Sequence, residues 1–150
     1  MQINTTRFGP VAIRTADILD FPHGLIGLEG CHRWVVLADA EHDGLGWMQS
    51  VDRAEIALAI VSPRRFVRGY RVRVSARDLG VLESPADADL QVVVSVSHHD
   101  TGPQGGGLSL NLKAPLVVCL ETRKGRQVIA KDDHPVRHWR GRREPLRRSA

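Results

Sequence analysis

The segment GLSLNLKAPLVVCLETRKGRQVIA, residues 107–130, contains two predicted strands and the tightest predicted turn of the chain. The leucines at 108, 110 and 112 alternate with polar residues, which is typical of a strand with one buried face. The continuous apolar run at 116–120 indicates a strand covered on both faces. The residues RKG at 123–125 predict a turn, and residues 127–129 return antiparallel. The segment therefore predicts a hairpin in the protein core.

The rest of the chain is predicted to be short strands joined by glycine and proline turns. Alternation or apolar runs place these strands at residues 2–7, 11–13, 18–21, 34–37, 47–51, 56–61 and 90–96, with a first turn at Gly9 and Pro10. The one predicted helix covers residues 76–82, where Ser75 caps the N-terminus and Asp78 lies in the first turn. A parallel α/β fold needs more crossover helices than this. We therefore predict a mainly β domain with one short helix, either a small antiparallel barrel or a sandwich.

The loop PHGLIGLEG, residues 22–30, combines three glycines with three large apolar side chains. Glycine adopts backbone angles that other residues resist, so we expect a compact loop. Leu25, Ile26 and Leu28 are too apolar to remain in water, and we expect them to fix the loop to the core.

Composition indicates a cytoplasmic protein. The 150 residues suit one domain, and the chain has neither an apolar run long enough to span a membrane nor the pattern of a signal peptide at its N-terminus. Its two cysteines are Cys31 and Cys119, and Cys119 lies in an apolar run where a reduced thiol acts as a small hydrophobe. We therefore expect no disulfide and a reducing compartment.

The net charge of +4 is a property of the C-terminus. Residues 1–133 carry 15 Lys and Arg against 16 Asp and Glu, whereas residues 134–150 carry six Arg and one Glu. We therefore divide the chain into a β domain at 1–133 and a basic, flexible tail at 134–150.

Reactive or metal-binding centres are weakly indicated. His98, His99 and Asp100 lie in a glycine-rich loop where adjacent histidines diverge, and Pro135 disfavours the helix that would bring His134 and His138 together. Cys31 and His32 are sequence neighbours, which point to opposite faces of a strand. We therefore expect no enzyme activity, no cofactor, no metal and no small-molecule substrate.

Three stretches together resemble one protein family. They are FPHGLIGLEG at 21–30 followed by RWVVL at 33–37, WMQSVDRAEIALAIVSP at 47–63, and LNLKAPLVVCLETRKGRQVI at 110–129. In this order and spacing they resemble the flagellar assembly factor FliW family, over roughly residues 2–130. The matching positions are Phe21, Pro22, Gly24, Leu25, Gly27, Trp47, Gln49, Ser50, Pro63, Asn111, Leu112, Lys113, Ala114, Pro115, Gly125 and Gln127.

The resemblance implies a small β-barrel-like fold and a non-enzymatic regulator. Members of the family bind newly made flagellin in the bacterial cytoplasm and also bind the translational regulator CsrA. Flagellin and CsrA compete for the factor, so that secretion of flagellin frees the factor to antagonise CsrA. The implied partners are therefore flagellin and CsrA.

The matching residues divide into structural and contact positions. We expect the Gly, Leu and Pro members to form turns and core. We expect five of the other matching residues to contact a partner, because polar groups and a tryptophan on strands can project outward. These are Trp47, Gln49, Ser50, Asn111 and Lys113. The resemblance also implies an acidic surface that repels RNA, for which the candidates are Glu41, Asp43, Asp52 and Glu55, with Asp87 and Asp89.

The basic tail suggests an alternative function, a basic-tailed nucleic-acid-binding module. Its arginines would neutralise phosphates while its tryptophan stacks on a base. The residues concerned are Arg137, Trp139, Arg140, Arg142, Arg143, Arg147 and Arg148. No folded platform supports this tryptophan, so we favour a solubilising tail and expect no direct RNA binding, while docking on an acidic partner remains a third reading.

Overall fold

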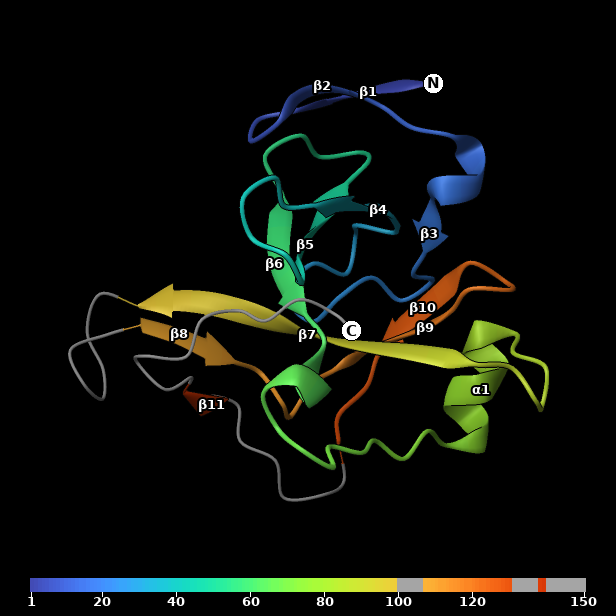
Figure 1. Ribbon diagram of the computed structural model, residues 1–150. Coiled ribbons are helices and arrows are strands. Elements are labelled where there is room, and N and C mark those ends of the chain that lie inside the picture. The colour runs from blue at the N-terminus through green and yellow to red at the C-terminus, as the bar shows by residue number, and fades with distance from the viewer. Residues whose placement is uncertain (100–106, 131–137, 140–150) are drawn as a thin grey trace.

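A curled β-sheet that closes on itself forms the body of the protein in the computed structural model, which describes residues 1–99, 107–130 and 138–139 (Figure 1). Each strand pairs with its neighbour in the order β7, β6, β5, β4, β3, β10 and β9, and β9 pairs with β7 to complete the circuit. The strands are β3 (Leu19–Asp20), β4 (Arg33–Ala38), β5 (Leu45–Ser50), β6 (Ala57–Val61), β7 (Leu90–His99), β9 (Leu116–Cys119) and β10 (Lys124–Gln127). The prediction of a mainly β, barrel-like domain is confirmed.

Strand β9 is the most buried element, as its apolar run predicts. Leu116 and Val118 face a core that contains Phe21 and Trp34. On the other face, Val117 and Cys119 pack with Leu82, the last residue of helix α1 (Ala76–Leu82). The strand therefore separates two apolar layers, which explains why no polar residue interrupts it.

The β9–β10 hairpin is confirmed, but the predicted position of its turn is wrong. The register pairs Lys124 with Cys119 and Gly125 with Val118, so the connection is residues 120–123. Arg123 has the positive φ of the turn, at 58°. Gly125 lies in the strand and not in the turn. A glycine is needed at this strand position because a β-carbon there would come within 2.3 Å of the Phe21 ring.

Helix α1 begins and ends as its sequence predicts. The Ser75 hydroxyl accepts the Asp78 N–H, and the Asp78 carboxylate accepts the Ser75 N–H in return, which satisfies two donors at the helix start. The helix ends at Glu83, whose φ is 50°.

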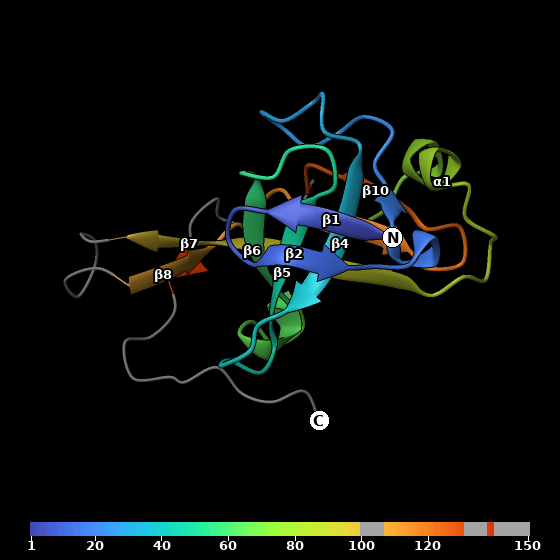
Figure 2. The ribbon, with the colours of Figure 1, turned by 90° about the horizontal axis from the view of Figure 1, so that it is seen from above.

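A separate hairpin, β1 (Gln2–Thr5) and β2 (Gly9–Ala12), lies across β4 and β5 (Figure 2). Ile3 and Ile13 pack with Val35 of β4 and form a small core on the outer face of the sheet. The predicted turn at Gly9 and Pro10 is wrong by one or two residues. Both residues belong to β2, where Pro10 is tolerated because the strand pairs only with β1.

The far half of β7 leaves the barrel and continues to His99, beyond its predicted end. There it pairs with β8 (Gly107–Leu110), which pairs in turn with β11 (His138–Trp139). Val61, Val94 and Leu110 belong to a second apolar cluster beneath this extension. Two short 3-10 helices, η1 (Thr15–Asp17) and η2 (Pro63–Arg65), complete the regular structure of the described residues.

The glycine-rich loop at 22–30 is compact, and one of its predicted anchors is wrong. Leu25 is 3% exposed and packs in the main core, whereas Ile26 is 61% exposed. Gly24 and Gly27 both have positive φ, and a β-carbon on Gly24 would lie 2.5 Å from the Glu29 carbonyl oxygen. The tight fold of this loop directs Ile26 outward.

Both cysteines are buried free thiols. Among the described residues, no helix has the length and apolar character needed to cross a membrane.

Candidate functional site

Trp47 is the best-positioned contact residue that the sequence predicts. It lies on β5 between Leu37 of β4 and Ala59 of β6, and its ring is half-buried on the outer face of the barrel. Its Nε1–H donates to Oδ1 of Asp39 over 2.9 Å. A half-buried tryptophan whose polar group is already satisfied by the protein offers its apolar ring to a partner.

Asp39 holds this ring in place and was missed by sequence reasoning. Its other oxygen, Oδ2, accepts the N–H groups of Glu41 and His42 at 3.1 and 2.8 Å and contacts Nδ1 of His42 at 3.0 Å. The Trp47 hydrogen bond is the main reason that the pKa of Asp39 falls to about 2, although burial opposes the shift. An aspartate directly after a strand and before a turn was the available signal.

One face of the ring is covered by the turn between β1 and β2. The Arg7 guanidinium carbon lies 4.0 Å from the Trp47 ring centroid, a cation–π geometry. The Phe8 ring meets Trp47 edge to face, with centroids 6.0 Å apart. The Thr6 N–H donates to the Ala54 carbonyl, which ties this turn to the β5–β6 loop. No local sequence pattern joins residues 7 and 47, so this contact was not predicted.

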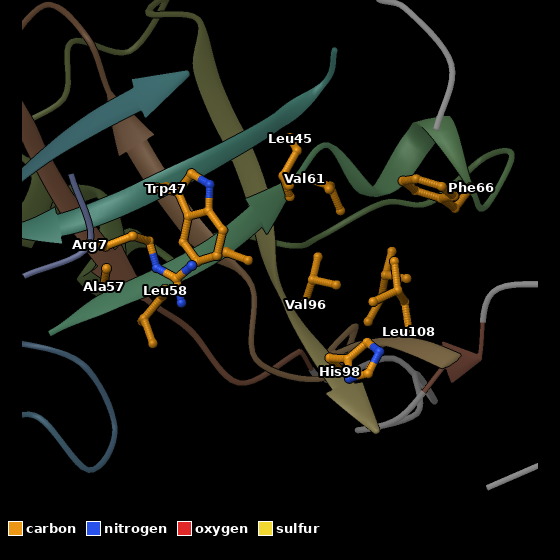
Figure 3. A pocket seen from close by; sticks show the side chains of 12 residues that line it. Arg7, Leu45, Trp47, Ala57, Leu58, Val61, Phe66, Val96, His98 and Leu108 are labelled. Carbon is orange, nitrogen blue, oxygen red and sulfur yellow. The ribbon is translucent and has the colours of Figure 1, made fainter. Parts of the chain in front are cut away.

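An apolar groove of about 380 Å³ begins at Trp47 and runs between the barrel and the β7–β8 extension (Figure 3). Its size lies within the range of about 300–1,000 Å³ that is usual for ligand pockets. The side chains that form its apolar surface come from β5, β6, β7, β8 and the residue that follows η2. They include Leu45, Trp47, Val61, Phe66, Val96 and Leu108. Arg7 and His98 contribute the polar groups. This combination suits an apolar ligand or polypeptide with a negatively charged group.

The prediction that Gln49 and Ser50 project outward is wrong. Both side chains are 0% exposed, because β5 passes under the β5–β6 loop at this point. The Gln49 amide donates to the carbonyls of Ser50, Ala54 and Ile56 at 3.0–3.2 Å. The Ser50 hydroxyl accepts the Arg53 N–H at 3.0 Å. These two side chains therefore stabilise the loop, and we do not include them among the residues that contact a partner.

Asn111 and Lys113 lie apart from the groove and do not line it. Oδ1 of Asn111 accepts the N–H groups of Lys113 and Ala114 at 3.2 and 3.1 Å, so its acceptor stabilises the turn that leads into β9. Both side chains are half-buried. Their contribution to partner binding stays a prediction.

The first and third family stretches meet in the structure. The Gln127 side chain accepts the Ile26 N–H at 2.8 Å and donates to the Ala114 carbonyl at 3.0 Å. Together with Gly125 under Phe21, this contact fixes the glycine-rich loop against the end of the barrel. The matching residues Phe21, Gly125 and Gln127 are thereby explained as structural.

The structure does not bring the four main acidic candidates together. Glu41 and Asp43 lie in the β4–β5 loop, whereas Asp52 and Glu55 lie in the β5–β6 loop at the other end of β5. Asp52 pairs with Arg33, and Glu55 pairs with Arg53 at 2.8 Å. The Arg33 hydrogen bond lowers the pKa of Asp52, and a main-chain hydrogen bond and Arg53 lower that of Glu55. Solvent screens exposed pairs of this kind, so they add little stability, but they do reduce the negative potential of the surface.

Most of the predicted basic tail lies outside the described residues. This applies to Arg137, Arg140, Arg142, Arg143, Arg147 and Arg148, as well as to His134 and Asp100 of the metal alternatives. The main chain of Trp139 pairs with Ser109 of β8.

The described part of the chain contains no cluster of three metal-ligating side chains. His99 has its Nε2 2.7 Å from the Ser109 hydroxyl. Cys31 is buried while His32 is exposed, so the two do not form a thiol and base pair.

Comparison with known proteins identifies the relatives of this chain. The family model described as FliW protein matches residues 2–139. A protein named flagellar assembly factor FliW from Ruminiclostridium cellulolyticum is 32% identical over 143 residues, which cover 93% of each chain. One of the same name from Azoarcus is 33% identical over 132 residues, or 86% of this chain and 90% of the relative.

A solved structure supports the fold. The crystal structure of the flagellar assembly factor FliW superposes with a TM-score of 0.81 at 22% sequence identity. The match covers 93% of this chain and 96% of that chain, so the barrel and its extension belong to one shared architecture.

Proposed function

This chain belongs to the FliW family, and from that premise we propose that it binds newly made flagellin and antagonises the translational regulator CsrA by direct protein contact. Its role is that of a flagellar assembly factor, a non-enzymatic function. In the proposal the protein acts in the cytoplasm and links the synthesis of flagellin to its secretion, because flagellin and CsrA compete for it.

The observation that carries the proposal is the fixed Trp47 at the edge of an apolar groove. Protein-binding energy is concentrated in a few aromatic and arginine side chains that border well-packed apolar surface. Trp47 is held by Asp39 at its Nε1 edge and by Arg7 over its ring face, so little side-chain entropy is lost when a partner covers it. We place the flagellin contact here.

The division of the chain fits this proposal. In it, residues 1–133 form the partner-binding domain and residues 134–150 form a basic tail that solubilises the protein or docks on acidic surface. The alternative function, a nucleic-acid-binding module, would depend on the tail alone and is not favoured by the relatives of this chain.

Co-purification tests the proposal. The tagged full-length protein is recovered from a flagellated bacterial lysate with and without nuclease, and bound flagellin and CsrA are quantified. We expect both to survive nuclease treatment. Loss of all bound protein after nuclease would favour the nucleic-acid alternative.

A matched pair of variants locates the contact. Trp47→Ala should weaken flagellin binding by about tenfold or more in calorimetry, as expected for an interface hot spot. Val36→Ala is the control, because Val36 is exposed and apolar but does not line the groove. Equal affinities for the two variants would remove the groove from the proposal.

A further inference from the structure

Strands β6 and β7 separate from each other along the groove. Their paired register includes only Ile60 with Ser95 and Val61 with Val94, although β6 begins at Ala57 and β7 continues to His99. Figure 1 shows the two strands running at a steep angle and diverging. The side chains in Figure 3 line the space that this divergence opens. We call it the β6–β7 split.

The main-chain groups of β6 at this place are directed into the split. In an antiparallel sheet, the N–H and C=O of successive residues point alternately to the two neighbouring strands. The Ser50 N–H donates to the Ile56 carbonyl at 3.0 Å, so residues 56 and 58 turn their polar groups toward β5. Ala57 and Ala59 therefore turn theirs away from β5, toward the split.

The same alternation applies to β7. The Asn111 N–H donates to the Ser95 carbonyl at 3.0 Å, so Ser95 faces the β8 side. The main chain of Val96 is therefore directed away from β8 and toward Ala59, its neighbour in the β6–β7 register, and the two strands part beyond this point. Two diverging strand edges thus border an apolar groove, and strand edges are templates for pairing with a further polypeptide segment.

The charge of the groove restricts the sequence of such a segment. The Arg7 guanidinium lies over Trp47, and among the described residues no carboxylate forms an ion pair with it. The rest of the groove wall near it is apolar, with Trp47, Leu58 and Val96. An extended segment with alternating apolar side chains and a carboxylate at one end would satisfy both features.

We propose that the β6–β7 split receives an extended, acidic and apolar segment of a partner polypeptide, which adds as a strand to the main chain of Ala57, beyond the last residues that β6 and β7 share. Its apolar side chains cover Trp47, and its carboxylate pairs with Arg7. The proposal rests on the proposed function in taking the groove as a protein-binding surface, and it adds the conformation and charge of the bound segment. Residues 140–150 of this chain are a poorer occupant, because their five arginines outnumber their one glutamate and repel Arg7.

Synthetic peptides test strand addition directly. A fluorescein-labelled peptide EVTVEV is titrated with the full-length protein, and binding is followed by fluorescence anisotropy. N-methylation of alternate residues removes the main-chain donors on one edge of the peptide. We expect methylation of one alternate set to weaken binding by about tenfold or more, and methylation of the other set to change it less than about twofold. Equal effects of the two sets, or no binding of EVTVEV, would overturn the proposal.

Protein variants test the two recognition elements. Ala57→Pro removes an N–H that faces the split and not β5, and it should abolish peptide binding, while Ala57→Ser should preserve it. Arg7→Glu should reverse the preference, so that the peptide KVTVKV binds better than EVTVEV. Arg14→Glu is the matched control, because Arg14 is an exposed arginine paired with Asp17. If a urea titration shows that the Ala57→Pro variant is not folded, the methylated peptides and the Arg7→Glu variant still test the proposal.

Other occupants give different results. If replacing the five arginines of residues 140–150 by glutamine tightens EVTVEV binding, the C-terminus of the chain itself occupies the split, and the proposal is wrong. A concentration-dependent dimer that Ala57→Pro dissolves would identify a second copy instead. Peptide binding without any flagellin co-purification would contradict the proposed function and leave strand addition supported.

Discussion

The indole N–H of Trp47 donates to the Asp39 carboxylate over 2.9 Å, and this bond joins the middle of β5 to the turn that precedes it. The same carboxylate accepts two main-chain N–H groups of its own turn. The ring at the groove and the shape of the β4–β5 loop are therefore determined by one ionised side chain. Partner recognition and local stability should change together when it is altered.

Asp39→Asn should destabilise the protein in a pH-dependent way. A carboxylate whose pKa is about 2 in the folded chain and ~3.9 when unfolded stabilises the fold above pH ~4, and this contribution is lost as the pH falls toward 2. We expect a loss of about 1–2 kcal/mol at pH 7, smaller than the full shift because the site is partly solvated.

Urea unfolding of both proteins at several pH values between 7 and 3 measures this loss. The difference in unfolding free energy should shrink as the pH falls below 4. Asp87→Asn, in an exposed loop, is the control and should have no comparable effect. A difference that stays constant over this pH range would contradict the role given to the Asp39 charge.

Gly125→Ala should destabilise the protein by about 3 kcal/mol, because an added β-carbon overlaps the Phe21 ring in a fully packed core. Gly80→Ala is the matched control. A β-carbon on Gly80 meets nothing within 4 Å, and alanine favours helix α1, so this change should stabilise by about 0.5–1 kcal/mol. Urea titration measures both.

The cause of the Gly125→Ala effect can be isolated with a second change. Phe21→Leu removes the ring edge that the new methyl group would strike. In the double variant we expect part of the loss to be recovered relative to the sum of the single changes, by about 1 kcal/mol or more. Simple additivity would show that the clash is not with Phe21.

The elements that sequence predicted correctly depend on local patterns. The apolar run of β9 and the cap of α1 at Ser75 and Asp78 each require only neighbouring residues, and both were confirmed. The turn near Gly125 was misplaced because this glycine is required by a contact and not by its own φ. A β-carbon at this position would strike the ring of Phe21, which directly follows β3. The residue types of this segment predicted the hairpin correctly. The reason for the glycine at position 125, however, is a contact with a residue far away in the sequence.

The candidate site was predicted only in part for the same reason. Trp47 was identified, but Asp39, Arg7 and Phe8 became part of the site only when β4, β5 and the β1–β2 turn came together. Gln49 and Ser50 have polar side chains on a strand, which made them resemble surface residues. Their burial depends on how the β5–β6 loop folds back over them. The alternation of apolar and polar residues along the sequence does not predict the conformation of this loop.

Gln49→Ala should therefore act on stability and not on partner contacts. The change leaves the carbonyls of Ser50, Ala54 and Ile56 without their side-chain donor and opens a cavity, at an expected loss of about 2–3 kcal/mol. Ser50→Ala loses one bond to the Arg53 N–H and should lose about 1 kcal/mol.

Flagellin affinity, measured by calorimetry where each variant is still folded, separates stability from contact. Both variants should bind within about twofold of the unchanged protein, because neither side chain reaches the surface. A tenfold weaker affinity of a folded Gln49→Ala protein would restore Gln49 to the contact surface.

Gln127→Ala should release the glycine-rich loop from the end of the barrel. The Gln127 side chain accepts the Ile26 N–H and donates to the Ala114 carbonyl, so it is the bond between the first and third family stretches. Its loss should speed amide hydrogen exchange at Ile26 by about tenfold, because a protecting bond worth about 1 kcal/mol is removed and the loop opens more often. Exchange at Leu28, whose N–H donates to the Leu25 carbonyl within the loop, is the internal control and should change less. If the two amides speed up equally, Gln127 anchors the loop as one unit. If neither amide changes, Gln127 does not hold the loop, and this outcome would contradict the anchoring role that the structure assigns to this side chain.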